Sequence, residues 1–180
     1  MSGSLLFEKK KESLLEVCAH LGYQTVKSAN TLVPIMIAQH EALFLPPSKK
    51  QHAIEHFVKT CDEIALQNTH IENSDLSMQI NRHLNKKSFV ILVGDFLGDF
   101  DFSVLAKRHD IHLIMIRDSF EENPIVLGEG EFIDPESGES ATFYFGERAR
   151  DAYATRYQEN DARLIKHLHR LGISYEKVLS

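Results

Sequence analysis

The residues of this chain that could do chemistry together are one aspartate that ends an apolar run and a few hydroxyls. Asp95 follows the apolar run 89–93, Ser74 stands where a helix should begin, and Ser2 and Ser4 lie at the N-terminus. Hydroxyl and carboxylate oxygens are what a hard divalent cation such as Mg²⁺ takes as ligands, with waters filling the remaining octahedral positions. Asp95, Ser74 with its neighbour Asp75, and Ser2 with Ser4 are therefore candidate ligands of a cation site, although their spacing alone does not establish one.

Each of these residues also has a purely structural interpretation. Ser74 or its neighbour Asn73 is suited to cap a helix N-terminus. Asp99 and Asp101 are typical of a turn and of the cap of the following helix. A carboxylate in the position of Asp95 is a common functional placement and also a common turn residue.

A second chemistry is a metal-dependent hydrolysis of phosphorylated substrates. Asp95 would be a metal ligand, and Asp75, His109 or Asp118 would be the acid or base. The chain has no glycine-rich phosphate loop and no Gly-x-Ser-x-Gly elbow, so nucleotide hydrolysis and serine-hydrolase chemistry are disfavoured. His52 and His56 have a spacing that could hold a metal, but two histidines without a third ligand are usually surface residues.

The stretch Ser88–Asp118, SFVILVGDFLGDFDFSVLAKRHDIHLIMIRD, must position Asp95. It has two apolar runs separated by a short amphipathic segment, which predicts strand, loop, helix and strand. A run that is apolar at every position suits a strand buried on both faces of a parallel sheet. In such open sheets ligands bind beyond the carboxyl ends of the strands, where we expect Asp95.

The rest of the chain predicts further helices and strands in a mostly parallel sheet flanked by helices. Helical spacing and capping residues predict helices over 8–28, from Ser48 onward, over 75–86 and over 146–171, the last stopped by Gly172. Extended segments are expected from Thr31, with Pro34 at a sheet margin, from Glu41, and at the C-terminus. The segments 124–133 and 141–145, joined by DPESGES, are typical of a hairpin.

Length and composition predict one soluble domain over residues 1–180. The net charge is -6 and no basic stripe is present, which argues against a nucleic-acid partner. No window reaches the ~18 apolar residues of a membrane span. Cys18 and Cys61 lie far apart in the sequence and form no metal or redox motif, so we expect buried, reduced thiols and a cytoplasmic location.

Four stretches of the chain resemble the bacterial domain-of-unknown-function 58 family. They are TLVPIMIAQHEALFLPPSKKQHAIEHF, NSDLSMQINRHL, the Ser88–Asp118 stretch, and GEFIDPESGESATFYFGERARDAYATRYQENDARLIKHLHRLGISY. Members of this family look like von Willebrand factor A domains and tend to be partnered with MoxR-type AAA+ ATPases. The resemblance implies a von Willebrand factor A-like fold and a non-enzymatic protein-interaction module.

The resemblance also implies a metal-ion-dependent adhesion site, written Asp-x-Ser-x-Ser, then Thr, then Asp. Ser2 and Ser4 match the two serines, Ser74 stands at the Thr and Asp95 at the last Asp. The first Asp would precede Met1, so we expect an incomplete site with weakened Mg²⁺ binding. The family's first, central strand would also be missing, which implies unpaired strand edges and a homodimer formed through them.

Overall fold

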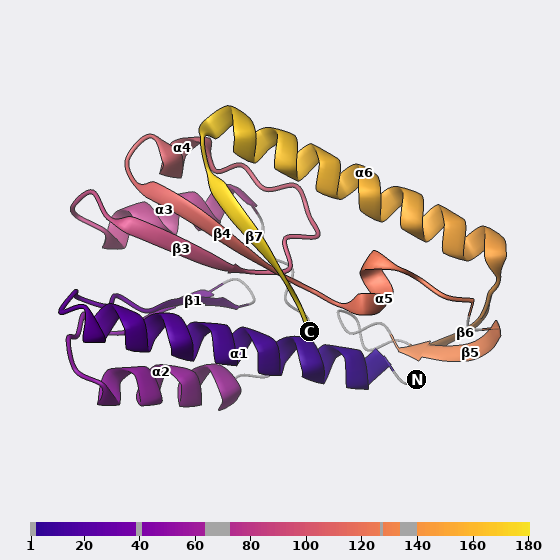
Figure 1. The fold of residues 1–180 in the computed structure, drawn as a ribbon, viewed down its shortest axis with the longest axis horizontal. Coiled ribbons are helices and arrows are strands. Elements are labelled where there is room, and N and C mark those ends of the chain that lie inside the picture. The colour runs from indigo at the N-terminus through magenta and orange to yellow at the C-terminus, as the bar shows by residue number, and fades with distance from the viewer. Residues whose placement is uncertain (1–2, 39–40, 64–72, 127, 134–139) are drawn as a thin grey trace.

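The computed structural model describes residues 3–38, 41–63, 73–126, 128–133 and 140–180, and its architecture is mixed α/β (Figure 1). The elements in chain order are α1 (Gly3–Lys27), β1 (Ile35–Ala38), β2 (Glu41–Phe44), α2 (His52–Glu63), α3 (Asn73–His83), β3 (Phe89–Gly94), α4 (Ser103–Ala106), β4 (Asp110–Arg117), α5 (Ser119–Glu122), β5 (Gly128–Ile133), β6 (Ser140–Phe145), α6 (Glu147–Leu171) and β7 (Ser174–Leu179). Among these described residues, no helix has both the length and the apolar character needed to cross a bilayer.

The centre of the fold is a three-stranded parallel sheet in the order β3-β4-β7. Val90 lies opposite Ile111 in the β3–β4 pair, and Leu113 lies opposite Tyr175 in the β4–β7 pair. Figure 1 shows α1 and α2 together on one side of this sheet and α6 on the other. The strand, loop, helix and strand predicted for 88–118 are confirmed, and so is a parallel sheet flanked by helices.

Two antiparallel pairs stand apart from the central sheet. β1 pairs with β2, and β5 pairs with β6, each as a separate two-stranded sheet. β1 begins directly after Pro34, which agrees with the predicted place of this proline at a sheet margin. β5 and β6 lie within or next to the two predicted extended segments and pair in the antiparallel sense. Residues 134–139, which connect them, lie outside the described residues, so the hairpin insertion stays a prediction.

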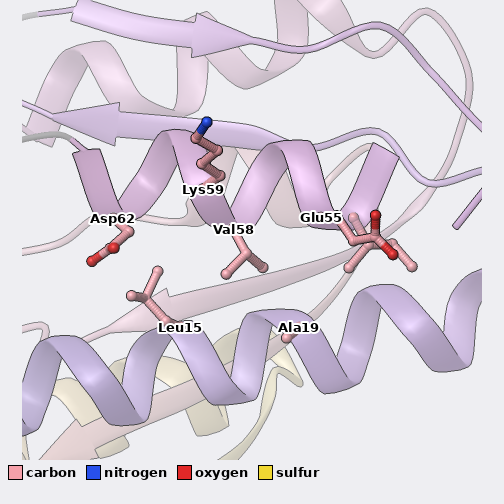
Figure 2. A pocket seen from close by; sticks show the side chains of 7 residues that line it. Leu15, Ala19, Glu55, Val58, Lys59 and Asp62 are labelled. Carbon is pink, nitrogen blue, oxygen red and sulfur yellow. The ribbon is translucent and has the colours of Figure 1, made fainter. Parts of the chain in front are cut away.

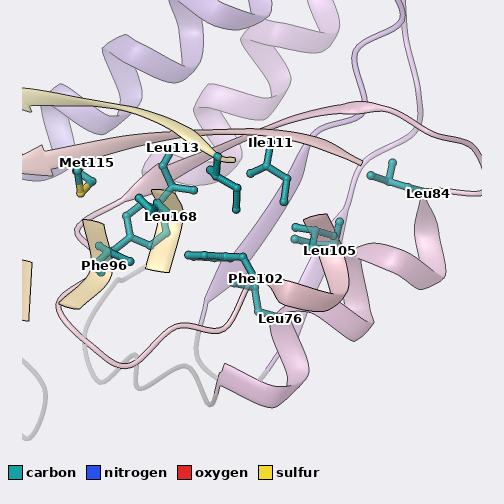
Figure 3. Packing of buried hydrophobic residues seen from close by; sticks show 12 residues of the cluster. Leu76, Leu84, Phe96, Phe102, Leu105, Ile111, Leu113, Met115 and Leu168 are labelled. Carbon is teal, nitrogen blue, oxygen red and sulfur yellow. The ribbon is translucent and has the colours of Figure 1, made fainter. Parts of the chain in front are cut away.

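The main core lies between the central sheet and the helices α3, α4 and α6 (Figure 3). Alternate residues of β4 point into it because successive side chains of a strand face opposite sides. The buried members are Leu76, Ile80, Leu84, Phe96, Phe102, Leu105, Ile111, Leu113, Met115, Leu164, Leu168 and Ile173. This core fixes the position of the loop between β3 and α4, which carries Asp95.

Several helix boundaries differ from the prediction. α1 begins at Gly3 rather than near Glu8, so Ser4 lies in its first turn and not in a loop. α2 begins at His52, a few residues after Ser48. α6 has the predicted limits: Gly146 is its N-cap, and Gly172 ends it with a φ of 67° in the left-handed region that glycine tolerates best.

Candidate functional site

Asp95 lies where the sequence predicts it, directly after the carboxyl end of β3. Its side chain is 53 % exposed. The next residue, Phe96, has a φ of 49°, an unusual value for a bulky residue. Such backbone strain persists only where the surrounding structure imposes it, and it clusters at functional sites.

Aromatic packing imposes this conformation. The Phe96 ring packs edge-on against Phe100 at a centroid distance of 5.4 Å and against Phe102 at 6.1 Å. The rings of Phe100 and Phe102 are stacked, and Phe96 and Phe102 are buried. Because Phe96 is anchored in this packing, its neighbours Asp95 and Leu97 are left exposed on the loop surface.

The carboxylate of Asp95 has a basic neighbour on α1. Lys10 Nζ lies 3.9 Å from Asp95 Oδ2 and also forms an ion pair with Glu121. Glu121 is nearly buried and is held in a capping box: the Asp118 N–H donates to Glu121 Oε2, and the Phe120 N–H donates to Asp118 Oδ1. α1 is thereby joined through one ammonium group to the carboxyl ends of both β3 and β4.

Beneath Asp95 lies a buried ion network. Arg117, the last residue of β4, is fully buried; its Nη1 donates to the backbone carbonyl of Asp95 and its Nη2 donates to Asp161 Oδ1 at 2.5 Å. Its guanidinium carbon lies 5.3 Å from the centroid of the Tyr157 ring. Lys177 Nζ contacts Asp161 Oδ2 at 2.5 Å and Glu122 Oε1 at 2.9 Å. We call Arg117, Glu122, Asp161 and Lys177 the carboxyl-edge network.

Burial and charge shift the titration of groups in and around this network. Burial alone would lower the pKa of Lys177. The hydrogen bonds that Lys177 donates to Asp161 and Glu122, together with the negative charges of these two carboxylates, outweigh burial and raise the pKa. Burial, assisted by the charges of Glu121 and Asp118, raises the pKa of Tyr153 to about 12. Burial likewise raises the pKa of the Tyr157 phenol. Lys177 therefore stays charged and the two phenols stay neutral at physiological pH.

The structure places the other predicted cation ligands only in part. Ser4 lies in the first turn of α1 and Ser74 in the first turn of α3. Ser2 lies outside the described residues, and so do the side chains of Ser4, Ser74 and Asp75. The expected meeting of these hydroxyls with Asp95 therefore stays a prediction.

The described residues by themselves do not fit a resident metal ion. Nowhere in the described part of the chain do three or more His, Cys, Asp or Glu side chains gather as metal ligands would. Asp95 has an ammonium group beside it instead. A single carboxylate paired with lysine does not hold Mg²⁺, which dehydrates reluctantly, so any site here depends on the serine hydroxyls.

His109 and Asp118 do not join Asp95 in an acid–base group. His109 precedes β4 and therefore lies at the amino end of the sheet, at the end opposite to Asp95. Its Nδ1 accepts a hydrogen bond from the Ser88 N–H at 3.2 Å, and its Nε2 lies 3.0 Å from Asn81 Oδ1. Burial and then the charge of Arg108 lower its pKa. Asp118 is buried and caps α5.

Asp99 and Asp101 make structural contacts, although the N-cap of α4 is Phe102 and not Asp101 as predicted. Asp101 Oδ1 accepts the Ser103 N–H at 2.8 Å at the start of α4. The hydrogen bond from the Ser103 side chain, followed by this backbone bond, lowers the pKa of Asp101. Asp99 forms an exposed ion pair with Arg163 of α6 at 2.8 Å. Both residues tie the loop after β3 to its neighbours.

Figure 2 shows a groove of about 480 Å³ between α1 and α2. Leu15 and Ala19 of α1 face Val58 of α2 across it, and Glu55, Lys59 and Asp62 form its rim. The two cysteines lie on the same pair of helices: Cys18 and Cys61 are free thiols, as predicted. Burial raises the pKa of Cys18 to about 12, and the nearby charge of Cys61 adds to this shift. The two thiols therefore lie near each other although they are far apart in the sequence.

Sequence reasoning missed most of the groups around Asp95. The signal for Arg117 was its position at the end of the apolar run IHLIMI, where a charged side chain needs a buried partner. Asp161 and Lys10 gave no local signal, because their partners lie far away in the sequence.

A parallel sheet flanked by helices, with an exposed carboxylate and a buried ion network at its carboxyl edge, defines an open-sheet α/β protein. The family model described as "Protein of unknown function DUF58" matches residues 1–163, so the chain belongs to the domain-of-unknown-function 58 family. The comparisons with curated proteins and with solved structures found no match.

Proposed function

We propose that this chain is a non-enzymatic protein-interaction module that engages its partner at the carboxyl edge of the sheet, with Asp95 at the centre of the contact. One observation carries the proposal: a strained Phe96 and its buried aromatic anchor hold Asp95 outward at the end of β3. Strain of this kind costs on the order of 1–3 kcal/mol, and the aromatic packing that maintains it also fixes the outward position of Asp95.

The surface around Asp95 suits a partner that presents a basic group beside an apolar one. Asp95 offers a half-exposed carboxylate, and Leu97, two residues later, is an exposed apolar side chain. The partner's cation would compete with Lys10 for the Asp95 carboxylate, and its apolar side chain would cover Leu97. A central charged contact with an apolar neighbour is typical of interface hot spots.

The finer part of the proposal rests on family membership and on the resemblance described above. We propose a von Willebrand factor A-like domain that works with a MoxR-type AAA+ ATPase in assembly or chaperone-like work. In a complete site of this kind, a divalent cation held by Asp95 with Ser2, Ser4 and Ser74 would offer an open position to an acidic group of the partner. We propose that the site is incomplete in this chain, where Lys10 lies 3.9 Å from Asp95, and that a basic group of the partner takes the place of the cation.

The test measures the affinity of this chain for the MoxR-type ATPase of the same genome by biolayer interferometry. Asp95→Asn should weaken binding tenfold or more, which corresponds to about 1.4 kcal/mol. Asp99→Asn is the matched control, because it removes the same charge from the same loop at an exposed position. Equal effects of the two substitutions would contradict a contact centred on Asp95, and no binding by the wild-type chain would contradict the choice of partner.

A separate titration tests the metal site. Calorimetry with Mg²⁺ and Mn²⁺ should show no binding below millimolar concentrations in the wild-type chain. Lys10→Met should expose Asp95 and strengthen cation binding relative to wild type. Tight binding by wild type that disappears in Asp95→Asn would show that the site is complete and that Lys10 does not replace the metal.

A further inference from the structure

The amino ends of the three strands of the central sheet lie side by side. Phe89, the first residue of β3, lies opposite Asp110 of β4, and His112 of β4 lies opposite Ser174, the first residue of β7. Because the strands are parallel, the segments that lead into them meet at one end of the sheet. These segments are 82–88, 107–110 and 169–174. Figure 1 shows this end of the sheet on the side away from α5.

This amino edge of the sheet is strongly basic. The three segments contain six Lys or Arg residues and one acidic residue, so their net charge is +5. The chain as a whole has a net charge of -6, so the remaining residues carry -11. The six residues, which we call the amino-edge patch, are all exposed; they are Arg82, Lys86, Lys87, Lys107, Arg108 and Arg170. No basic stripe is visible in the sequence because these residues come from three distant segments.

Contacts between the segments hold the basic groups close together. Lys87 Nζ lies 2.9 Å from Asp110 Oδ1, which joins the first segment to the second. Arg108 Nη1 donates to the carbonyl of Asn81 at 3.2 Å, and Asn81 directly precedes Arg82. Neighbouring strands lie about 4.8 Å apart, so the starts of the three strands span about 10 Å. One short ligand can therefore reach the whole amino-edge patch.

Little within the described chain compensates this positive charge. The acidic residue of the three segments pairs with Lys87, and the other five members of the patch have no ion-pair partner among the described residues. Arg82 and Arg170 lie in the last turns of α3 and α6, where cations stabilise the helix dipole. This structural role does not extend to Lys86 and Lys87, which follow the end of α3.

An exposed aromatic side chain lies beside the patch. Phe89 is 67 % exposed, whereas the rest of β3 is half-buried. It lies two residues after Lys87 and directly opposite Asp110 in the β3–β4 register. A charged contact beside an aromatic side chain is typical of interface hot spots. The amino edge thus offers both charge and an apolar surface to a ligand.

We propose that the amino-edge patch binds a short acidic segment of a partner protein, and that an apolar side chain of this segment covers Phe89. An extended segment of about six residues is about 20 Å long, enough to cross the starts of all three strands. A long nucleic acid fits less well, because it would extend past the patch and be repelled by the charge of -11 on the remaining residues. The patch lies at the end of the sheet opposite to Asp95, so this proposal is independent of the function proposed above.

Fluorescence anisotropy with labelled synthetic peptides tests the proposal at low salt, about 50 mM, where screening is weak. The wild-type chain should bind the peptide EEEFEE at least tenfold more tightly than the neutral peptide QQQFQQ. The triple variant Arg82→Gln/Lys86→Gln/Lys107→Gln should bind EEEFEE at least tenfold more weakly than wild type. The matched control, Lys59→Gln/Arg148→Gln/Arg156→Gln, removes three exposed positive charges outside the patch and should change the affinity less than threefold.

A fourth variant separates the apolar contact from the charge. Phe89→Ser should weaken binding of EEEFEE at least threefold and leave binding of EEEEEE unchanged, and urea midpoints verify that each variant is folded. The proposal is overturned if the two triple variants weaken binding equally, or if the wild-type chain does not distinguish EEEFEE from QQQFQQ. Tighter binding of a single-stranded oligothymidylate of equal charge would also overturn it, because a nucleic acid would then be the ligand.

Discussion

Removing the charge of Asp161 should destabilise this protein far more than removing an equal charge from the surface of the same helix. Arg117 is fully buried and Asp161 nearly so, and Asp161 is the only carboxylate recorded in contact with Arg117 among the described residues. Breaking a buried ion pair by removing one partner costs about 3–5 kcal/mol, because an uncompensated charge stays inside. The Asp95 carbonyl and the Tyr157 ring still face the guanidinium, so we expect the low end of that range.

The expected loss in Asp161→Asn is therefore about 3 kcal/mol, measured as the free energy of unfolding in urea. For a chain of this length it corresponds to a fall in Tm of roughly 6–12 °C. Asp151→Asn is the matched control: Asp151 lies on α6, is exposed, and pairs only with its neighbour Arg150 in the described structure. Its effect should stay within about 0.5 kcal/mol.

The partner substitution should behave asymmetrically. In Arg117→Met the carboxylate of Asp161 keeps Lys177 at 2.5 Å, so the buried charge that remains is still compensated and the cost is smaller than in Asp161→Asn. In the double variant Arg117→Met/Asp161→Leu no buried charge of this pair is left, and much of the stability should return. Two results would refute this reasoning. One is a loss in the free energy of unfolding that is the same in Asp161→Asn as in Asp151→Asn, and the other is a larger loss in Arg117→Met than in Asp161→Asn.

Three further outcomes are expected. Burial holds the pKa of His109 below its ordinary 6.5, so the unfolded chain binds the extra proton more readily than the folded chain does. The contribution of His109 to stability is therefore full above pH ~6.5 and falls as the pH drops below that value. The urea midpoints at pH 7.5 and pH 5.5 should differ less in His109→Gln than in wild type. With its pKa raised to about 12, Cys18 should react with Ellman's reagent at pH 8 roughly a thousandfold more slowly in the native than in the guanidinium-unfolded protein, and equal rates would contradict its burial. Gly172→Ala should cost about 1 kcal/mol because of the φ of 67°, whereas Gly98→Ala, with no positive φ and a Cβ contact of 3.5 Å to Phe100, should be nearly neutral in thermal unfolding.

Sequence patterns predicted those parts of the fold whose causes are local. The continuous apolar runs from Phe89 and Ile111 predicted two strands of a parallel sheet, and both strands are present. β4 is largely buried as predicted, whereas β3 is only half-buried and its first residue is exposed. The limits of α6 followed from Gly146 and Gly172, because helix ends depend on the few residues around them. The position of Asp95 at the carboxyl edge followed from the strand alone.

Other parts depend on contacts that no spacing reveals. α5 has only four residues, too few for a periodic pattern, although Asp118 and Glu121 have the spacing of its capping box. Because the sequence does not reveal α5, it leaves Asp118 as a candidate acid or base rather than as the cap of this helix. The pairing of Arg117 with Asp161 joins residues 44 positions apart, and that of Lys10 with Glu121 joins residues 111 apart. Long-range ion pairs are set by packing, so the sequence could not show that Asp95 has a lysine beside it.

The carboxyl edge of the sheet carries one carboxylate whose charge is only weakly compensated within the described residues. At the carboxyl edge, most charges are compensated within the chain, and Asp95 is the carboxylate left half-exposed with a distant ion pair of 3.9 Å. Since exposed ion pairs contribute at most about 1 kcal/mol, Lys10 is a weak competitor there, and a partner's basic group can replace it at little cost. The carboxyl edge of the sheet therefore suits a reversible, charge-selective contact.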